Sequence, residues 1–342
     1  MPDLIPSTML PPPRPKPKLQ HPPAPPDPAS LQLRYKLSTP TFSILSAIPG
    51  SPDRRAILQT ASQATEFRSF PIHAAEKAFF RTINETKPIP YLIREAVSQP
   101  WHKVFLLVQI DLMNDGWPSK LSAAARKELH GERGRIYNIL EKCLRCLVDI
   151  LGQRMDGRGV TTGLDVLRSI KAGVWEGNGQ DLLQVEGIGP ARAEKLAKAG
   201  VRNIRQLSGM DFFHIERLLS RNPPFGQQVL RAVACFPLLN LKLDVVSRPP
   251  GGREGDSTWI ARILISYDNE EMPQWKKARP WTTLVIEGEN GRLVWFWRGS
   301  TKKLSGGKEI VVSLNAKKGE QLKVVFACEE VVGTLIKETF RI

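Results

Sequence analysis

Residues 182–201, LLQVEGIGPARAEKLAKAGV, decide the fold of the central part of this chain. An apolar lead-in runs into Gly187-Ile188-Gly189, and apolar side chains then recur at the i, i+3 and i+4 spacing of a helix. Gly200 stands where a left-handed helix stop is favoured. Because glycine has no side chain, the two glycines of the turn also let the backbone come close to a ligand. The stretch predicts a tight turn followed by a short helix.

A second short helix is predicted after Asn203, which can cap it, with Gln206 three residues on. Two short helices joined by a Gly-x-Gly hairpin resemble the helix-hairpin-helix motif, whose hairpin amides hold a DNA backbone phosphate. Free N–H groups at a helix N-terminus attract an anion on general physical grounds. A hairpin that only packs is the alternative, and the sequence leaves both open. The predicted nucleic-acid-binding residues are Gly187, Ile188, Gly189, Arg192, Lys195, Lys198 and Arg202.

The composition favours a polyanionic partner. With 49 Lys and Arg against 34 Asp and Glu, the 342-residue chain has a formal net charge of +15. Nucleic acid is favoured over a membrane surface, because no basic amphipathic helix stands out. Four cysteines in this length argue against a disulfide framework, and no apolar run approaches the ~18–20 residues of a membrane span. A protein without membrane contact, in a reducing compartment, is expected.

Periodicity divides the chain into a helical part and a sheet part. A tail at 1–30 contains several proline pairs, is expected to be disordered, and is a candidate for binding a partner. A transitional segment at 31–50 leads into a helical bundle at 51–180, whose first helix is expected to be capped by Ser51. Helices are predicted at 73–84, 93–97, 132–153 and from 162 onward, with a break at 157–159 and an undecided apolar run at 104–110. The hairpin and the closing helices occupy 181–236.

From Leu239 the apolar residues alternate with polar ones, as in half-buried strands. Seven short strands with turns between them predict an immunoglobulin-like sandwich over 237–342. The predicted fold class is therefore α+β and multidomain, with a helical bundle and hairpin before an all-β sandwich. The predicted strands are 239–245, 259–267, 282–286, 293–297, 310–314, 322–327 and 335–342.

The sequence contains no catalytic constellation. Cys143 and Cys146 form a C-x-x-C without a second ligand pair, so they are interpreted as buried small hydrophobic residues, and Cys235 and Cys328 are interpreted as core. The chain has no G-x-x-x-x-G-K-[ST] phosphate loop. We therefore predict no catalytic, cofactor-binding or metal-binding residue.

Three groups of residues together resemble a known domain family. They are Ala64-Thr65-Glu66-Phe67 with residues 75–77 and 83–84, the apolar run 103–109, and Trp175-Glu176 with residues 183–184 and 215–226. Their order over 35–342 is similar to the Sec sixty-three domain, the C-terminal unit of several Ski-like superfamily-two helicases. Within that family the Asn-Pro-Pro-Phe-Gly stretch at 222–226 looks most like the meiotic crossover-promoting DNA helicases.

The resemblance implies a role, and one departure limits it. Such helicases carry two ATPase domains with a phosphate loop and a DExH-type box, and this sequence has neither. The chain is expected to be a piece or a separate product of such a helicase, non-enzymatic, with ATP and magnesium confined to the parent's core. The expected partners are single-stranded or branched DNA and helicase core domains in cis or in trans, and the expected location is the nucleus. A protein-interaction scaffold and an accessory domain of spliceosomal-type RNA helicases remain the alternatives.

Overall fold

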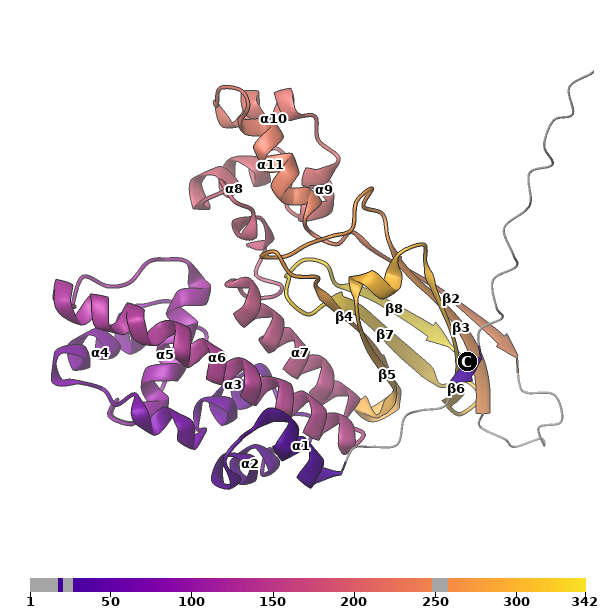
Figure 1. Cartoon of the computed structure of the whole chain (residues 1–342), viewed down its shortest axis with the longest axis horizontal. Coiled ribbons are helices and arrows are strands. Elements are labelled where there is room, and N and C mark those ends of the chain that lie inside the picture. The colour runs from indigo at the N-terminus through magenta and orange to yellow at the C-terminus, as the bar shows by residue number, and fades with distance from the viewer. Residues whose placement is uncertain (1–17, 21–26, 248–257) are drawn as a thin grey trace, which may run out of the picture.

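The computed structural model describes residues 18–20, 27–247 and 258–342 (Figure 1). It shows a helical bundle, then a group of short helices, then two β-sheets, in chain order. The predicted α+β class, with a bundle before a sandwich, is therefore confirmed. Most of the tail predicted at 1–30 lies outside the described residues.

Most helices of the bundle are amphipathic, and their apolar side chains meet in one core. Their bounds are α1 (Pro28–Tyr35), α2 (Thr39–Ser46), α3 (Arg54–Ser62), α4 (Lys77–Thr86), α5 (Pro100–Met113), α6 (Ala123–Gln153) and α7 (Gly157–Ala172).

The segment 31–50, predicted to be transitional, contains most of α1 and all of α2. Side chains of Asp27 and Ser38 cap these helices, and each helix has a proline in its first turn. Leu31 and Leu45 are fully buried in the core of the bundle. Burial of these side chains makes the segment part of the bundle.

Several helix boundaries differ from the predictions. Asp53, rather than Ser51, caps α3, because its carboxylate accepts the Ala56 N–H at 2.7 Å. Residues 93–97 form no helix, the undecided run at 104–110 lies within α5, and α6 begins at Ala123 rather than at residue 132. The predicted break after Gln153 exists, but it lies at 154–156 rather than at 157–159, because α7 begins at Gly157.

Gly157 is a point of close approach between the bundle and the sandwich. A β-carbon added there would lie 2.9 Å from the Cα of Leu293 in β5, closer than real contacts allow. The Leu293 N–H also donates to the Met155 carbonyl at 2.8 Å. A glycine is therefore needed to start α7 against the strand, which explains why its presence does not break the helix.

The short helices follow the bundle and include the quoted stretch. A 3₁₀ turn at Asp181–Gln184 precedes the hairpin. Behind it lie α8 (Pro190–Lys198), α9 (Ile204–Ser208), α10 (Phe212–Leu219) and α11 (Phe225–Ala234). As predicted, Asn203 caps α9, and its side chain accepts the Gln206 N–H at 2.8 Å.

The sandwich contains the seven predicted strands. Its two sheets have the orders β1-β6-β3-β2 and β5-β4-β7-β8, so the chain crosses between sheets as in a Greek key. The two-residue strand β1 was not predicted and pairs in parallel with β6. The strands are β1 (Leu19–Gln20), β2 (Leu239–Ser247), β3 (Thr258–Tyr267), β4 (Trp281–Glu287), β5 (Leu293–Ser300), β6 (Lys308–Asn315), β7 (Gln321–Cys328) and β8 (Ile336–Arg341).

The three parts share two cores rather than three. Val285 and Val325, on the outer face of the second sheet, are buried within the core of the bundle. Leu196 and Leu207 of the short helices belong to the core inside the sandwich. The hairpin region is therefore continuous with the sandwich, and the sandwich packs against α7 (Figure 1).

In the part of the chain that the structure describes, no helix is both long enough and apolar enough to cross a membrane.

Candidate nucleic-acid interface

The hairpin between the 3₁₀ turn and α8 is held by its own backbone. The Ile188 N–H donates to the Val185 carbonyl at 3.0 Å, and Gly187 has a φ of +85°, in the left-handed region that favours glycine. Gly189 is the N-cap of α8, with extended backbone, and its carbonyl accepts the Arg192 N–H at 3.0 Å. The turn therefore aims the start of α8 outward.

Two backbone donors of this hairpin are unengaged. Within the described residues, the N–H groups of Gly187 and Gly189 have no hydrogen-bond acceptor. Both residues are exposed, and a β-carbon at Gly189 would meet nothing within 4 Å. Ile188 differs, because its N–H is used by Val185 and its side chain is only 4% exposed. Ile188 thus holds the turn, whereas the glycines leave donors free for an anion.

Two arginines are fixed beside the hairpin by one aromatic ring. The Arg192 guanidinium donates to the Gly187 carbonyl and lies 5.0 Å from the centroid of the Phe225 ring. The Arg221 guanidinium lies 5.9 Å from the same centroid. Cation–π contacts of this kind hold a guanidinium in place while leaving N–H groups for a phosphate. The hairpin therefore has two preorganised positive charges next to it.

The other predicted basic residues are exposed on α8 and after it. Lys195 and Arg202 have exposed side chains, and the Arg202 backbone N–H donates to the Gln206 side chain. Lys198 pairs with Glu194 at 2.7 Å, and the hydrogen bond and charge of Lys198 lower the pKa of that glutamate. Lys198 is thus partly neutralised. Exposed Glu186, next to Gly187, adds one negative charge to the hairpin.

The hairpin is tied firmly to the sandwich. The Gln184 side-chain amide donates to the Val332 carbonyl at 3.1 Å and accepts the Val332 N–H at 2.9 Å. Arg205 of α9 donates to the Leu239 carbonyl at 2.7 Å and pairs with Asp268 at 2.9 Å. These bonds fix the direction in which the hairpin faces relative to the sheets.

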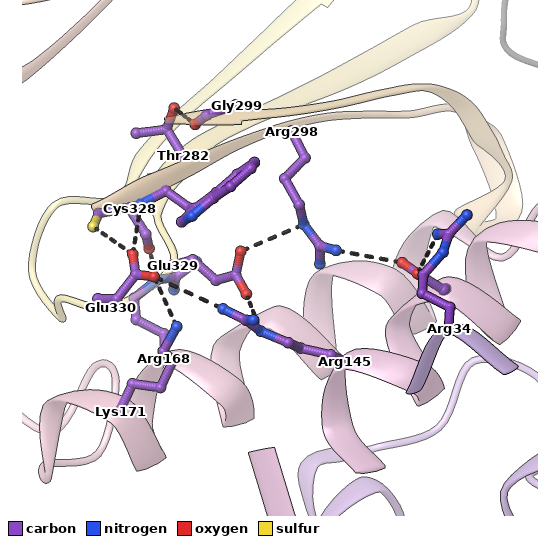
Figure 2. Close-up of polar contacts among 12 residues, drawn as sticks. Arg34, Arg145, Arg168, Lys171, Thr282, Arg298, Gly299, Cys328, Glu329 and Glu330 are labelled. Atoms are coloured by element: carbon purple, nitrogen blue, oxygen red, sulfur yellow. Dashed lines mark hydrogen bonds and ion pairs between the residues drawn. The ribbon is translucent and has the colours of Figure 1, made fainter. Parts of the chain in front are cut away.

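The sandwich is joined to α6 and α7 by a seam of ion pairs (Figure 2). Glu329 accepts from Arg145 at 3.1 Å and lies 3.4 Å from Arg298, while Lys171 pairs with Glu330 at 2.7 Å. Burial would lower the pKa of Arg298, but the neighbouring carboxylates raise it. The ion pairs of the seam therefore stay ionised although they are shielded from water.

Arg168 is the most deeply buried cation of the seam, with 1% of its surface exposed. Its guanidinium donates to Glu176 at 2.8 Å, to Asp165 at 3.0 Å and to the Cys328 carbonyl at 2.6 Å. Cys328 ends β7, so one α7 side chain joins two carboxylates of the helical part to the backbone of the sandwich. Such a group can be buried only because every charge is paired.

The N-terminal segment reaches the seam as well. The Tyr35 hydroxyl donates to Asp149 of α6 at 2.6 Å, and Arg298 lies 3.4 Å from the same carboxylate. Burial and the negative charge of Asp149 raise the pKa of Tyr35, so this hydroxyl stays protonated and keeps donating. Helix α1, α6 and strand β5 thus meet at one carboxylate.

The stretches that carry the family resemblance build the fold. The Glu66 carboxylate accepts from the Ser38 N–H and from the Thr41 hydroxyl, which fixes α2. The Gly226 N–H donates to buried Glu216 at 2.9 Å, and a β-carbon at Gly226 would lie 2.1 Å from the Phe212 carbonyl oxygen. Glu66, Glu216 and Gly226 thus lock helices together.

The cysteines agree with the prediction in three positions and contradict it in one. Cys143, Cys146 and Cys328 are buried, and burial raises the pKa of Cys146 to about 12. Cys235 is exposed at the end of α11, so its interpretation as core is wrong. Among the described residues, no group of three or more His, Cys, Asp or Glu side chains is placed to hold a metal ion.

Sequence reasoning missed Arg221 and Phe225 as members of the candidate interface. They lie in the Asn-Pro-Pro-Phe-Gly region, far along the chain from the hairpin, and only the packing of α11 brings them to it. The available signal was a loop between helices in which an arginine and an aromatic residue flank a pair of prolines.

The fold and this candidate interface define a class of protein: a helical and β-sandwich module with an exposed glycine hairpin that is tied to the sandwich. Residues 25–341 match the model of the Sec63 Brl domain family, and the chain belongs to that family. The resemblance inferred from the sequence is thus confirmed.

The curated relatives are DNA helicases. The chain is 23% identical to ATP-dependent DNA helicase MER3 of Saccharomyces cerevisiae over 82% of its length. It is 21% identical to probable ATP-dependent DNA helicase HFM1 of Xenopus tropicalis over 93%, and 22% identical to that of Mus musculus over 90%. The chain spans 24%, 24% and 21% of these relatives, which is less than a quarter of their length.

Proposed function

We propose that this chain is an accessory module of an ATP-dependent DNA helicase, which holds the backbone of nucleic acid at its hairpin. One observation carries the proposal: the free N–H groups of Gly187 and Gly189 lie beside the preorganised guanidinium groups of Arg192 and Arg221. Amide donors and fixed guanidinium groups together suit a phosphodiester, which is recognised without regard to base sequence. Lys195 and Arg202 add charge around this contact.

The module also braces a helicase core, which binds ATP and magnesium, in cis or in trans. The relatives are ATP-dependent helicases, and the chain corresponds to less than a quarter of each. The buried pairs of the seam and the bonds of Gln184 support a rigid platform for such a core. We also propose that the module works in the nucleus, in meiotic recombination leading to crossovers, as the resemblance of residues 222–226 to the meiotic crossover-promoting DNA helicases implies.

Fluorescence anisotropy across a salt titration tests the hairpin. Gly189→Asp is the sharpest variant, because Gly189 has extended backbone and open space, and an Asp at an N-cap stabilises a helix. Its carboxylate would occupy the donors that the phosphate needs. Gly187 is less suitable, since its φ of +85° and the nearby Phe225 ring make any side chain strained.

We expect Gly189→Asp and Lys195→Glu each to weaken binding to labelled DNA about tenfold or more. Each also lowers the slope of log affinity against log salt by about one, as the loss of one phosphate contact does. Lys127→Glu, the same charge reversal as Lys195→Glu at an exposed position of α6, serves as the control and binds as wild type. Wild-type affinity in both hairpin variants would show that the hairpin only packs.

The alternatives are tested in the same experiment. The donors of the hairpin recognise a phosphodiester of DNA or RNA alike, so an RNA of the same sequence is included. A protein-interaction scaffold is favoured by one observation: β1, a piece of the proline-rich tail, pairs with the edge of β6. Sheet edges accept extended segments in this way. A folded chain without affinity for any nucleic acid, even at low salt, would favour the scaffold.

A further inference from the structure

A pair of aromatic rings, one exposed and one half-buried, begins α10. The centroids of Phe212 and Phe213 are 4.0 Å apart, and the Phe213 side chain is 63% exposed. The buried face of α10 consists of Ile215, Glu216 and Leu219, so the packing of the helix does not use Phe213. Because the Phe213 ring stays in contact with water, the fold does not gain the free energy that burying it would provide.

The start of α10, which carries the aromatic pair, lies next to the hairpin. A β-carbon at Gly187 would be 3.3 Å from the Phe225 ring, and Phe225 is followed directly by Gly226. Gly226 in turn lies against the carbonyl of Phe212, and α8 contacts α10. Figure 1 shows α8 and α10 at the same end of the molecule, away from the bundle.

The surroundings of Phe213 are mostly basic. Arg217 follows it by one helical turn and is exposed, with His214 3.3 Å from its guanidinium, and Arg221 leads to the Phe225 ring. The first amides of α10 are not available to an anion, because the Asp211 carboxylate accepts the N–H groups of Phe213 and His214. The start of α10 can therefore contact a ligand through the exposed Phe213 ring rather than through these backbone N–H groups.

We propose that Phe213 stacks an unpaired base of the strand whose backbone lies at the hairpin. This inference rests on the proposed function and narrows its ligand to single-stranded nucleic acid or a junction between single and double strands. Aromatic faces stack bases of any sequence, and basic neighbours guide the backbone past them. A duplex keeps its bases paired, so it would use the hairpin but not the ring.

The surface has a basic surround, which favours the polyanion over an apolar protein segment. Arg192 and Arg221 lie over the Phe225 ring beside the hairpin, and Arg217 is exposed one helical turn after Phe213, while Glu216 is buried and bonded to Gly226. An apolar peptide would gain nothing from these cations, whereas each phosphate that one of them neutralises releases counterions.

The test compares Phe213→Ala with wild type on a single strand containing 2-aminopurine, on the matching duplex and on a junction. We expect single-strand affinity to fall by about 5- to 150-fold, the range for one lost base stack, with an unchanged salt slope. Duplex affinity should stay within twofold, and the change in 2-aminopurine fluorescence on binding should disappear. Phe213→Trp restores stacking, and Trp281→Ala, which removes an exposed aromatic from the sandwich, binds as wild type.

The outcomes separate this inference from the proposed function. Wild-type single-strand affinity in Phe213→Ala, with binding lost in Gly189→Asp, overturns the base platform and leaves the hairpin in place. Equal losses of affinity for single strand and duplex in Phe213→Ala also overturn it, because the ring would then contribute to binding of the phosphate backbone rather than to base stacking. Absence of all binding by the wild-type chain overturns both. Circular dichroism melting of each variant verifies that it is folded.

Discussion

Replacing Arg168 by methionine removes the cation that joins α7 to the end of β7. Methionine keeps much of the length and volume of the side chain, so the change is mainly one of charge and hydrogen bonding. Glu176 then loses its ion-pair partner, and the Cys328 carbonyl loses a donor at 2.6 Å. Asp165 keeps a second partner, because Arg54 pairs with it at 3.2 Å.

The expected cost follows from burial. Glu176 and Asp165 are 6% and 8% exposed, so water cannot replace the lost guanidinium. Breaking a buried pair by removing one partner costs about 3–5 kcal/mol of unfolding free energy. Arg34, which pairs with Asp149 from the surface, is the matched control, and its side chain is 56% exposed. Arg34→Met should cost less than about 1 kcal/mol, as exposed pairs do.

Urea unfolding followed by tryptophan fluorescence measures the two free energies. A second variant, Arg168→Met with Glu176→Gln, removes the uncompensated charge and should recover part of the loss. A cost for Arg168→Met no larger than that for Arg34→Met would refute the reasoning. So would a double variant that is less stable than the single one, because charge would then not be the cause.

Three further predictions concern packing, pH and thiol chemistry. Gly226→Ala forces a β-carbon against the Phe212 carbonyl, and thermal unfolding should show a loss of more than about 2 kcal/mol; a loss below 0.5 kcal/mol would contradict the close approach. Burial acts to raise the pKa of Glu66, but hydrogen bonds such as that from Thr41 lower it below its ordinary 4.5. The ionised carboxylate therefore stabilises the fold above that pH. This stabilisation is lost as the pH falls through the pKa of the folded state. Glu66→Gln should therefore be less stable than wild type at pH 7, and a gap that does not shrink below about pH 4.5 would argue against this. A thiol reagent at pH 8 should label one cysteine of the native chain, Cys235, and all four after unfolding; fast labelling of any buried thiol would show that the core opens readily.

The sheet part of the fold was predictable because its signal is local. Leu239, Leu241 and Leu243 alternate with polar residues, and the strand Leu239–Ser247 follows that period. The bundle was harder to predict. The first turns of α6 carry few buried apolar residues, so its start at Ala123 gives little periodicity.

Buried charges and long-range neighbours account for what the sequence did not reveal. Fully buried Lys103, which pairs with Glu76 and Glu132, breaks the rule that charges lie outside, and only the folded chain shows its partners. By contrast, the glycines of the hairpin and the basic residues near them can be identified from a single stretch of sequence. The placement of Phe225 and Arg221 beside them depends on how α11 packs.

The bond from Arg168 to the Cys328 carbonyl links residues 160 positions apart, and this has a consequence for synthesis on the ribosome. At ~5–20 residues per second, roughly 10–30 s pass between the emergence of the two partners. During that interval Arg168 and the carboxylates of Asp165 and Glu176 have no covering strand. A nonsense mutation before residue 328 would make this condition permanent. The helical bundle would then be destabilised although its own sequence is complete. The cell would degrade the product as a misfolded helical domain rather than retain it as a shortened sandwich.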